Sequence, residues 1–437
     1  MPSHRSRRSS QSASSRQHAV LMAGLLGFTA TAFAAGSWQG ELSLGVRQFA
    51  EPNEPVQANT DVTLSGKLKY QSEWNNGYDE LTIEPIFRVN SEDSEQNRVD
   101  FQSLSWNHQT DLWSFRTGVR TVTWQVVESL HLVDVVNQID AAADVDGEDK
   151  LGELMFNVVR LTDWGNIELL IMPGFRERVL PGEEGRLRPP LSYEFPVGPL
   201  QTVNVPGLGT IAVPVPGAPQ SVTINFDPDF VTYESAAEEL RTDAAIRATW
   251  IPGDWEITLS HFSGTSREPQ IVFSEGVLHP NYPVIDQTGL ELQYAAGNWL
   301  WKAEAISNSG FEEERYAASV AGFEYTFSGL GETGYDIGAL AEYLWDERED
   351  APLRSDVFVG GRLSLNDIAG TQLLLGGIVD HETGEYLALA EFSRRLGSKM
   401  KIEFELRAIG QNADDERQDF GFLHKDDYAN LTITRYF

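Results

Sequence analysis

The sequence contains no cysteine, which excludes disulfides, thiolate catalysis and metal centres built on cysteine. Basic residues are scarce, with 33 Lys and Arg against 65 Asp and Glu, and the formal charge is −32. A nucleic-acid-binding protein needs Lys and Arg to neutralise phosphates, so nucleic acid is not expected as a partner. The sequence also lacks G-x-S-x-G, H-E-x-x-H and a glycine-rich phosphate loop. We therefore predict that the protein is not an enzyme and uses no cofactor.

The first 34 residues have the pattern of a secretory signal peptide. Four arginines precede an apolar run from Ala19 to Phe28, and Ala32-Phe33-Ala34 forms a small-residue cleavage motif. A single membrane anchor is the alternative, but the apolar run is short and rich in Ala, Gly and Thr. No later segment offers about 18 uncharged apolar residues. Residues 35–437 are therefore expected to be exported, either as a soluble protein or as a barrel in a Gram-negative cell outer membrane.

The exported part alternates between apolar and polar residues. From Met400 to Ala408, apolar side chains at even positions alternate with charged side chains at odd positions, which predicts a β-strand with one apolar face. Similar segments recur and are roughly 9–12 residues long, as membrane-spanning strands require. Aromatic side chains near the strand ends are typical of the girdles at the two bilayer interfaces; they include Trp113, Trp250, Trp299, Tyr343 and Trp345.

The connections between these segments alternate between short and long. Short ones include Pro252-Gly253 and Gly297-Asn298, whereas 49–60 and 263–286 are long. Short periplasmic turns and long extracellular loops are typical of outer-membrane barrels. We therefore predict an all-β fold, a transmembrane antiparallel up-and-down β-barrel of about 18 strands (between 16 and 20). Outer-membrane lipids are expected partners, and the terminal Phe437 resembles the signal that delivers such barrels to their insertion machinery.

Two extracellular loops, residues 123–152 and 174–240, are long enough to enter the barrel. Half of the 20 prolines fall within 174–240, which predicts a restrained, irregular loop or a strand-like flap. A loop of this length is usually functional or disordered. A constriction inside the pore, a lid over its mouth, an ordered outer cap and a flexible loop all remain open for this segment.

The first of these loops carries two further patterns. Val126, Val127, Leu130 and Val133 fall at helical spacing and predict a short helix. The acidic residues at 140–149 resemble a calcium loop in composition, but the glycine and the terminal glutamate of that motif are not in place. We interpret this stretch as a solvated acidic segment without a metal.

Part of the sequence resembles a known group of proteins. The pattern R-x-G-x-R-x-x-x-W at residues 116–124 is followed by D-V-V-N-Q-I-D at 134–140 and D-W-G at 163–165. This order resembles a stretch in an uncharacterised family of Gram-negative outer-membrane barrels, known only as a domain of unknown function. The resemblance implies an outer-membrane barrel associated with transport of hydrophobic molecules, and it implies no catalytic residues.

A barrel of this size keeps an aqueous lumen unless loops close it, because its charged inward residues cannot be buried in a dry core. The residues predicted to line the pore are Lys67, Lys69, Glu84, Arg88, Arg116, Arg120, Arg247, Lys302, Glu304, Glu342, Arg362, Lys401, Glu403, Glu405 and Arg407. Three of them, Arg88, Arg116 and Arg120, form either a basic ladder along one wall or ion pairs with Glu84 and loop acids.

The predicted function is a porin-like channel for passive passage of small solutes through a charged lumen. One alternative is an outer-membrane component of a transport or export system for a hydrophobic or polymeric ligand. A structural or adhesive barrel without a pore is the other. The solute, the ion selectivity and the formation of a homo-oligomer are left open by the sequence.

Overall fold

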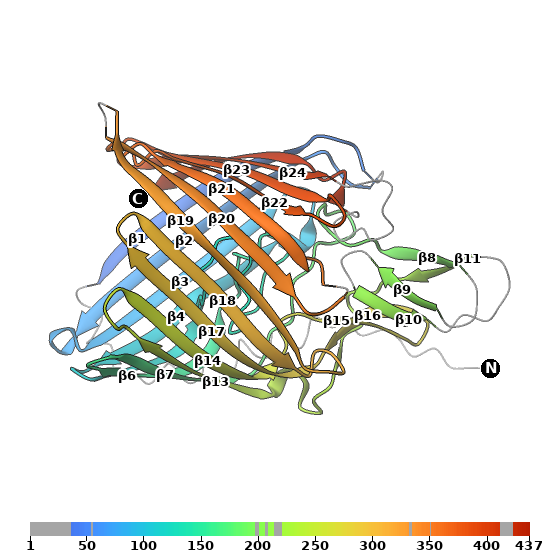
Figure 1. Ribbon diagram of the computed structural model, residues 1–437, viewed down its shortest axis with the longest axis horizontal. Helices are drawn as coiled ribbons and strands as arrows, with labels where there is room; N and C mark the ends of the chain where they lie inside the picture. The colour runs from blue at the N-terminus through green and yellow to red at the C-terminus, as the bar shows by residue number, and fades with distance from the viewer. Residues whose placement is uncertain are drawn as a thin grey trace.

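The chain folds as a β-barrel with extra β-structure at one end (Figure 1). The computed structural model describes residues 36–53, 56–196, 201–205, 209–213, 221–331, 334–349, 351–410 and 423–437. The predicted signal peptide, residues 1–34, lies outside these described residues. In the described part of the chain, no helix has the length and apolar character needed to cross a membrane.

Eighteen strands form one antiparallel sheet. They are β1 (Ser37–Phe49), β2 (Thr60–Trp74), β3 (Asp79–Asn90), β4 (Arg98–Gln109), β5 (Trp113–Arg120), β6 (Glu153–Thr162), β7 (Gly165–Pro173), β13 (Thr242–Trp250), β14 (Trp255–Thr265), β17 (Val284–Ala296), β18 (Trp299–Ser309), β19 (Tyr316–Leu330), β20 (Tyr335–Asp346), β21 (Ser355–Ser364), β22 (Gln372–Asp380), β23 (Tyr386–Leu396), β24 (Met400–Gly410) and β25 (Tyr428–Tyr436). Each pairs with the next in this order, and β1 also pairs with β25, which closes the barrel. The predicted fold class is confirmed.

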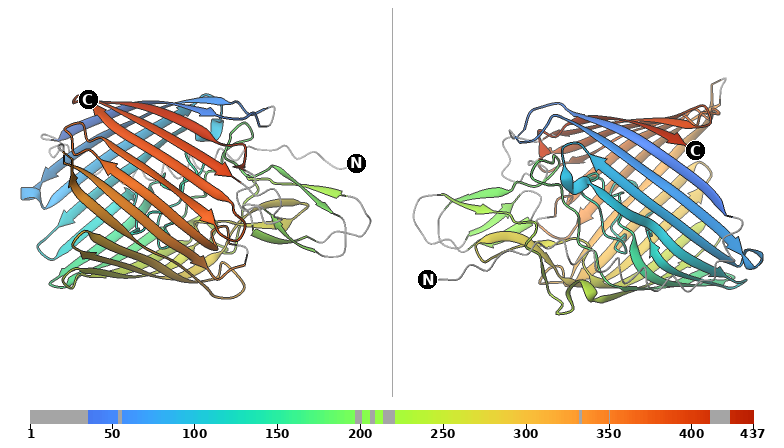
Figure 2. Two further views of the ribbon diagram at one scale, coloured as in Figure 1. Left: turned by 45° about the horizontal axis from the view of Figure 1, so that its top comes forward. Right: turned by 180° about the vertical axis from the view of Figure 1, so that it is seen from behind.

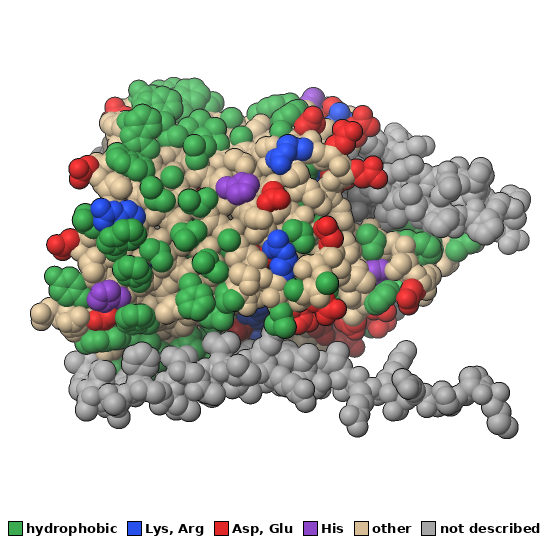
Figure 3. Space-filling view, turned by 90° about the horizontal axis from the view of Figure 1, so that it is seen from below, with side chains coloured by type: hydrophobic (Ala, Val, Ile, Leu, Met, Phe, Trp, Pro, Cys, Tyr) green, Lys and Arg blue, Asp and Glu red, His purple; other side chains and the backbone are tan. Residues whose placement is uncertain are grey.

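Side-chain alternation assigns one face of each strand to the outside. In β24, Phe404 and Leu406 are exposed whereas Arg407 is buried. The strand-end aromatics predicted to form girdles, such as Trp299 and Trp345, are likewise exposed on the outer face. Figure 3 shows hydrophobic side chains spread over the outside of the barrel, with acidic side chains gathered toward the end that carries the extra strands. An apolar outer wall of this kind is the surface that a barrel presents to lipid.

The short and long connections lie at opposite ends of the barrel. Short turns join β13 to β14 and β17 to β18, and their glycines, Gly253 and Gly297, have φ values of 65° and 62°. Glycine adopts this left-handed conformation without a steric penalty, which permits the tight reversal. The long connections, including 121–152 and 174–241, all leave from the other end, which we call the long-loop end. The described residues also contain three short 3-10 turns: η1 (Asn75–Gly77), η2 (Ser94–Gln96) and η3 (Glu238–Leu240).

Seven short strands extend beyond the barrel at the long-loop end, and we call them the cap (Figure 2). They are β8 (Ser192–Pro196), β9 (Gln201–Val205), β10 (Gly209–Val213), β11 (Ser221–Asn225), β12 (Thr232–Tyr233), β15 (Gln270–Ser274) and β16 (Val277–Tyr282). Phe195, Ile224, Phe226 and Leu278 form a small buried core that joins strands of the connection 174–241 to strands of the connection 266–283 between β14 and β17. The proline-rich segment therefore builds strand-like flaps, one of the outcomes left open by the sequence.

The barrel closes through a seam between β1 and β25. Ser43 Oγ and Thr434 Oγ1 lie 2.8 Å apart although the residues are 391 positions apart in sequence. At the end of the seam, the backbones of Gly40 and Phe437 exchange two hydrogen bonds of 2.9 Å. A Cβ at Gly40 would lie 2.2 Å from the Phe437 ring, so a larger residue at this position would displace the ring from its present place.

Candidate functional site

Residues 121–152, between β5 and β6, fold into the barrel, and we call them the inward loop. Trp124, Val133 and Val136 are buried in one cluster with inward side chains of the wall, including Met172 and Phe262. A second cluster joins the loop to another part of the wall and contains Val127 with Val320, Leu340, Leu344, Phe358 and Ile378. Because these partners lie on strands from β6 to β22, the loop crosses the lumen. Its coil is visible behind the strands in Figure 2.

The helix predicted from Val126, Val127, Leu130 and Val133 is wrong, because residues 121–138 contain no helix. The apolar side chains contact two different parts of the wall, since Val127 lies in the cluster with Leu340 and Val133 lies in the cluster with Phe262. Their spacing therefore reflects packing against the inside of a barrel rather than one face of a helix.

Two wall carboxylates hold the first half of the inward loop. Glu304 Oε1 accepts hydrogen bonds from the backbone N–H groups of Val126 at 2.8 Å and Val127 at 3.3 Å. Glu342 accepts from the backbone of Glu128 and Ser129, both at 2.9 Å, and from Ser129 Oγ at 2.6 Å. These N–H groups have no helical partners, so the carboxylates replace the hydrogen bonds that a helix would have supplied. Glu304 and Glu342 therefore lie on the inner face but beneath the loop, with exposures of 0% and 4%.

The acidic second half of the loop is held by arginines of the opposite wall. Asp140 Oδ2 pairs with Arg88 at 2.6 Å and with Arg98 at 2.8 Å. Asp144 pairs with Arg47 of β1 at 2.6 Å. The interpretation of this stretch as a solvated acidic segment is wrong for these two aspartates, because both side chains are largely buried against guanidinium groups.

Burial also changes the protonation of this half of the loop. Asp146 lies 3.3 Å from Arg407, but burial and the neighbouring Asp144 raise the pKa of its carboxyl to about 7. Burial likewise raises the pKa of Asp149 to about 6. Both carboxyls therefore titrate near neutral pH, and the contacts of the loop with the wall depend on pH.

The two halves of the inward loop are tied to each other. Lys150 Nζ pairs with Asp134, and His131 Nε2 lies 2.9 Å from Glu148 Oε1. At the base of the loop, Asn137 Nδ2 donates to the carbonyl oxygens of Arg120 and Leu151 at 2.9 and 2.8 Å, which joins the end of β5 to the start of β6. The loop is thus a fixed partition inside the lumen, held by its base, by its own cross-links and by both walls.

A polar cavity of about 510 Å³ remains beside the inner wall of β2–β5. Its lining residues are Lys69, Glu80, Thr82, Glu84, Gln102, Ser103, Ser105, Asn107, Gln109, Arg116, Arg120 and Thr121. Four of them, Lys69, Glu84, Arg116 and Arg120, belong to the set predicted to line the pore. We call this hollow the polar pocket.

The other predicted lining residues lie in ion pairs or small clusters elsewhere along the wall. Lys67 lies 3.2 Å from Glu41 and 3.7 Å from Glu84, whereas Lys302 lies 3.9 Å from Glu324. The remaining pairs are Arg247 with Glu291, Arg362 with Glu128 at 2.9 Å, Lys401 with Glu403 at 2.6 Å and Arg407 with Glu405 at 2.8 Å. The structure thus separates the predicted set into residues around the polar pocket, residues that hold the loop and locally paired residues.

Sequence reasoning missed the apolar inner surface that receives the loop. In β20, Leu340 and Leu344 point inward and are buried, although Tyr343 and Trp345 on the other face are exposed. Between residues 337 and 345, strand β20 therefore carries apolar side chains on both faces, and Glu342 is the charged exception on the inner face. This two-faced pattern was the available signal that the lumen is filled at this point.

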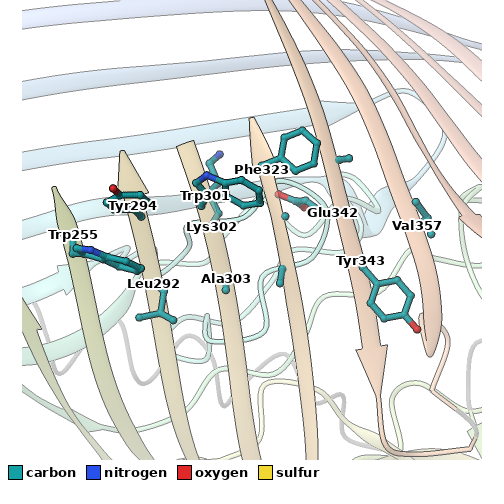
Figure 4. A pocket seen from close by; sticks show the side chains of 13 residues that line it. Trp255, Leu292, Tyr294, Trp301, Lys302, Ala303, Phe323, Glu342, Tyr343 and Val357 are labelled. Atoms are coloured by element: carbon teal, nitrogen blue, oxygen red, sulfur yellow. The ribbon is translucent and has the colours of Figure 1, made fainter. Parts of the chain in front are cut away.

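A second hollow, of about 530 Å³, lies on the outside of the barrel across β14–β21 (Figure 4). Exposed aromatic side chains wall it, among them Trp255, Trp301 and Tyr343. Its floor contains the small residues Ala303 and Ala321. Because the groove opens on the apolar outer face, it suits lipid acyl chains rather than a hydrated solute.

No protein-family model matches the sequence, and no curated protein sequence matches it. Among solved structures, a BenF-like porin from Pseudomonas fluorescens Pf-5 aligns with 93% of this chain and 99% of its own, at 8% identity and a TM-score of 0.50. Pseudomonas aeruginosa OpdQ covers 92% of this chain and 96% of its own, at 9% identity and a TM-score of 0.48. Wzi, a carbohydrate-binding barrel involved in group 1 capsule assembly in Escherichia coli, covers 92% and 84%, at 10% identity and a TM-score of 0.48.

The closed 18-strand sheet with its apolar outer face defines a transmembrane β-barrel. The alignment with the BenF-like porin shows that the fold is that of the outer-membrane porins. The resemblance to the family of unknown function has no support from a family model, and that finer assignment stays a prediction.

Proposed function

We propose that this protein is an outer-membrane channel for passive passage of small hydrophilic solutes, narrowed by the inward loop. The polar pocket carries this proposal, because a cavity of about 510 Å³ with a wholly polar lining persists on the inner wall beside the partition. A charged and hydroxylated surface of this kind needs water around it, since dry burial of so many polar groups is prohibitive. The channel assignment gives the chain no catalytic residues.

The proposal includes an orientation and partners. The short turns would face the periplasm and the long loops with the cap would face outward, as in other bacterial barrels. Lipids would cover the apolar wall, and Phe437 beside Gly40 would present the terminal signal for the insertion machinery.

The alternative role in handling a hydrophobic or polymeric ligand finds less support. The apolar inner surface around Leu340 and Leu344 is already covered by the inward loop. The polar pocket is lined by polar side chains only. A hydrophobic ligand would gain little free energy from contact with such a wall, because little of its apolar surface would be buried against other apolar surface. The resemblance of residues 116–165 to the family associated with hydrophobic transport therefore supports the barrel more than that cargo.

Conductance of the purified chain in planar lipid bilayers tests the channel proposal. The matched variant replaces residues 125–134 by a short Gly-Ser linker, which removes the half of the loop held by Glu304 and Glu342. We expect steps of current from the natural chain and larger steps from the variant. Silence of the natural chain at all voltages would refute the channel, and equal conductance of the two chains would refute the loop as its constriction.

A further inference from the structure

The polar pocket contains two arginines that lack carboxylate partners. Arg116 and Arg120 lie on the inner face of β5, four residues apart, and both line the pocket. In the described part of the chain neither has an ion pair within 4.0 Å, and the hydrogen bond of Arg116 runs from its Nε to Ser114 Oγ at 3.2 Å. The Nη1 atom of Arg120 is buried and has no hydrogen-bond partner. That atom is shielded from the pocket, but both side chains line the cavity, and within the described residues their other guanidinium nitrogens, apart from Arg116 Nε, have no hydrogen-bond partner.

Other arginines of the inner wall show the contrast. Arg88 and Arg98 share Asp140, and Arg247 pairs with Glu291. The sequence left open whether Arg88, Arg116 and Arg120 form a basic ladder or ion pairs. The structure divides this set, because Arg88 is paired with a loop acid whereas the two arginines of β5 are not.

The acidic groups near the pocket are engaged by other side chains. Glu84 lies 3.7 Å from Lys67 Nζ, and Glu80 accepts a hydrogen bond from Thr82 Oγ1 at 2.9 Å. On the neighbouring wall, Glu168 accepts from Asn157 Nδ2 at 2.7 Å. These carboxylates stay charged, but the pocket is lined by three cationic side chains, Lys69, Arg116 and Arg120, against two acidic ones, Glu80 and Glu84. A negatively charged solute would supply the close partner that the two arginines of β5 lack.

Neutral hydrogen-bonding groups surround the two arginines. The pocket is lined there by Gln102, Ser103, Ser105 and Asn107 of β4. The register pairs Asn107 with Arg116 and Ser105 with Gly118, which places these groups on the strand adjacent to the guanidinium groups. No aromatic or aliphatic side chain lines the pocket. A hydroxylated ligand therefore fits this surface better than an apolar one.

We propose that the polar pocket is a binding subsite for small hydroxylated anions, that is, carboxylates or phosphates that also carry hydroxyl groups. Arg116 and Arg120 would bind the oxyanion, because guanidinium groups match the geometry of carboxylate and phosphate oxygens. The amides and hydroxyls of β4 would bind the hydroxyl groups of the solute. This inference rests on the proposed channel, for which it names the class of solute.

The test compares the double variant R116Q/R120Q with the control K302Q/K401Q. Both variants remove two positive charges from the inner wall, but Lys302 and Lys401 lie outside the pocket and face Glu324 and Glu403. Isothermal titration calorimetry in detergent measures binding of gluconate, glucose 6-phosphate, glucose and butyrate, and heat-modifiable migration on gels verifies that each barrel is folded. The single variant R120Q serves if the double variant does not fold.

We expect gluconate and glucose 6-phosphate to bind the natural chain more tightly than glucose or butyrate. Each lost arginine should weaken binding of both anions by roughly tenfold, and the control should bind as the natural chain does. Equal affinity for glucose and gluconate, equal affinity for butyrate and gluconate, or equal loss in both double variants would overturn the proposal. Calorimetry needs no current, so a chain that binds anions but is silent in bilayers would refute the channel and leave the subsite standing.

Discussion

The contact between Glu342 and the inward loop offers the sharpest test of how the lumen is partitioned. The substitution E342Q keeps the shape of the side chain but replaces one carboxylate oxygen by an amino group. That group cannot accept hydrogen bonds from Glu128 N, Ser129 N or Ser129 Oγ, which now lie 2.6 to 2.9 Å from the carboxylate. The substitution therefore places an N–H donor next to the donors of the loop, at a site where the side chain is only 4% exposed.

The size of the effect follows from these contacts. A hydrogen bond to a charged acceptor contributes roughly 1.5–3 kcal/mol. In E342Q the remaining amide oxygen can still accept some of the three hydrogen bonds from the loop. We expect docking of this half of the loop to weaken by about 2–3 kcal/mol, which raises the released population roughly 30- to 150-fold. Amide hydrogen exchange of residues 124–133 measures this population directly, and current fluctuations in bilayers provide a second measure.

The matched control is E324Q. Glu324 is an inward carboxylate on the neighbouring strand β19, and its ion pair is with Lys302 at 3.9 Å rather than with the loop. The control therefore makes the same change of charge without removing a loop contact. If exchange of residues 124–133 were equally fast in the two variants, the assignment of Glu342 as an anchor of the loop would be refuted.

Three further predictions concern the loop and the wall. Acidification from about pH 8 to about pH 5 should reduce the current fluctuations in bilayers. Docking of the loop raises the pKa of the Asp146 carboxyl to about 7, so the docked state favours the protonated carboxyl, and docking weakens as the pH rises through that value. Replacing Lys150 by Met leaves a buried carboxylate unpaired and should destabilise the docked loop by about 3 kcal/mol, seen as faster protease cleavage between residues 121 and 152. L64R, on the exposed outer face, should lower the unfolding free energy in lipid by about 2–4 kcal/mol, whereas S65R on the adjacent inward position should cost much less.

The barrel strands were predictable because lipid and water impose a strict alternation on them. The segment around Phe404 and Arg407 carries this pattern within nine residues, and no distant contact is needed to read it. Turn residues such as Gly253 then fix where each strand ends. The strand count and the positions of the long connections follow from these local signals.

The interior was harder to predict from the sequence because it depends on contacts between residues that are far apart in the chain. Arg47 and Asp144 are 97 positions apart, and Glu342 and Glu128 are 214 positions apart. Nothing near Asp144 in the sequence indicates an arginine partner, so a solvated segment was the natural interpretation. The helix prediction failed for the same reason, because the wall carboxylates satisfy the backbone of Val126 and Val127 from outside the loop.

The seam between β1 and β25 has a consequence for assembly in the cell. Residues 391 positions apart meet across it, so β1 must keep its edge unpaired while the strands up to β25 are added. An open edge of this kind pairs readily with other chains and is open to proteases. Newly exported molecules would therefore be most vulnerable to aggregation and degradation just before β25 joins, and a chaperone that shields β1 would protect them until the cylinder closes.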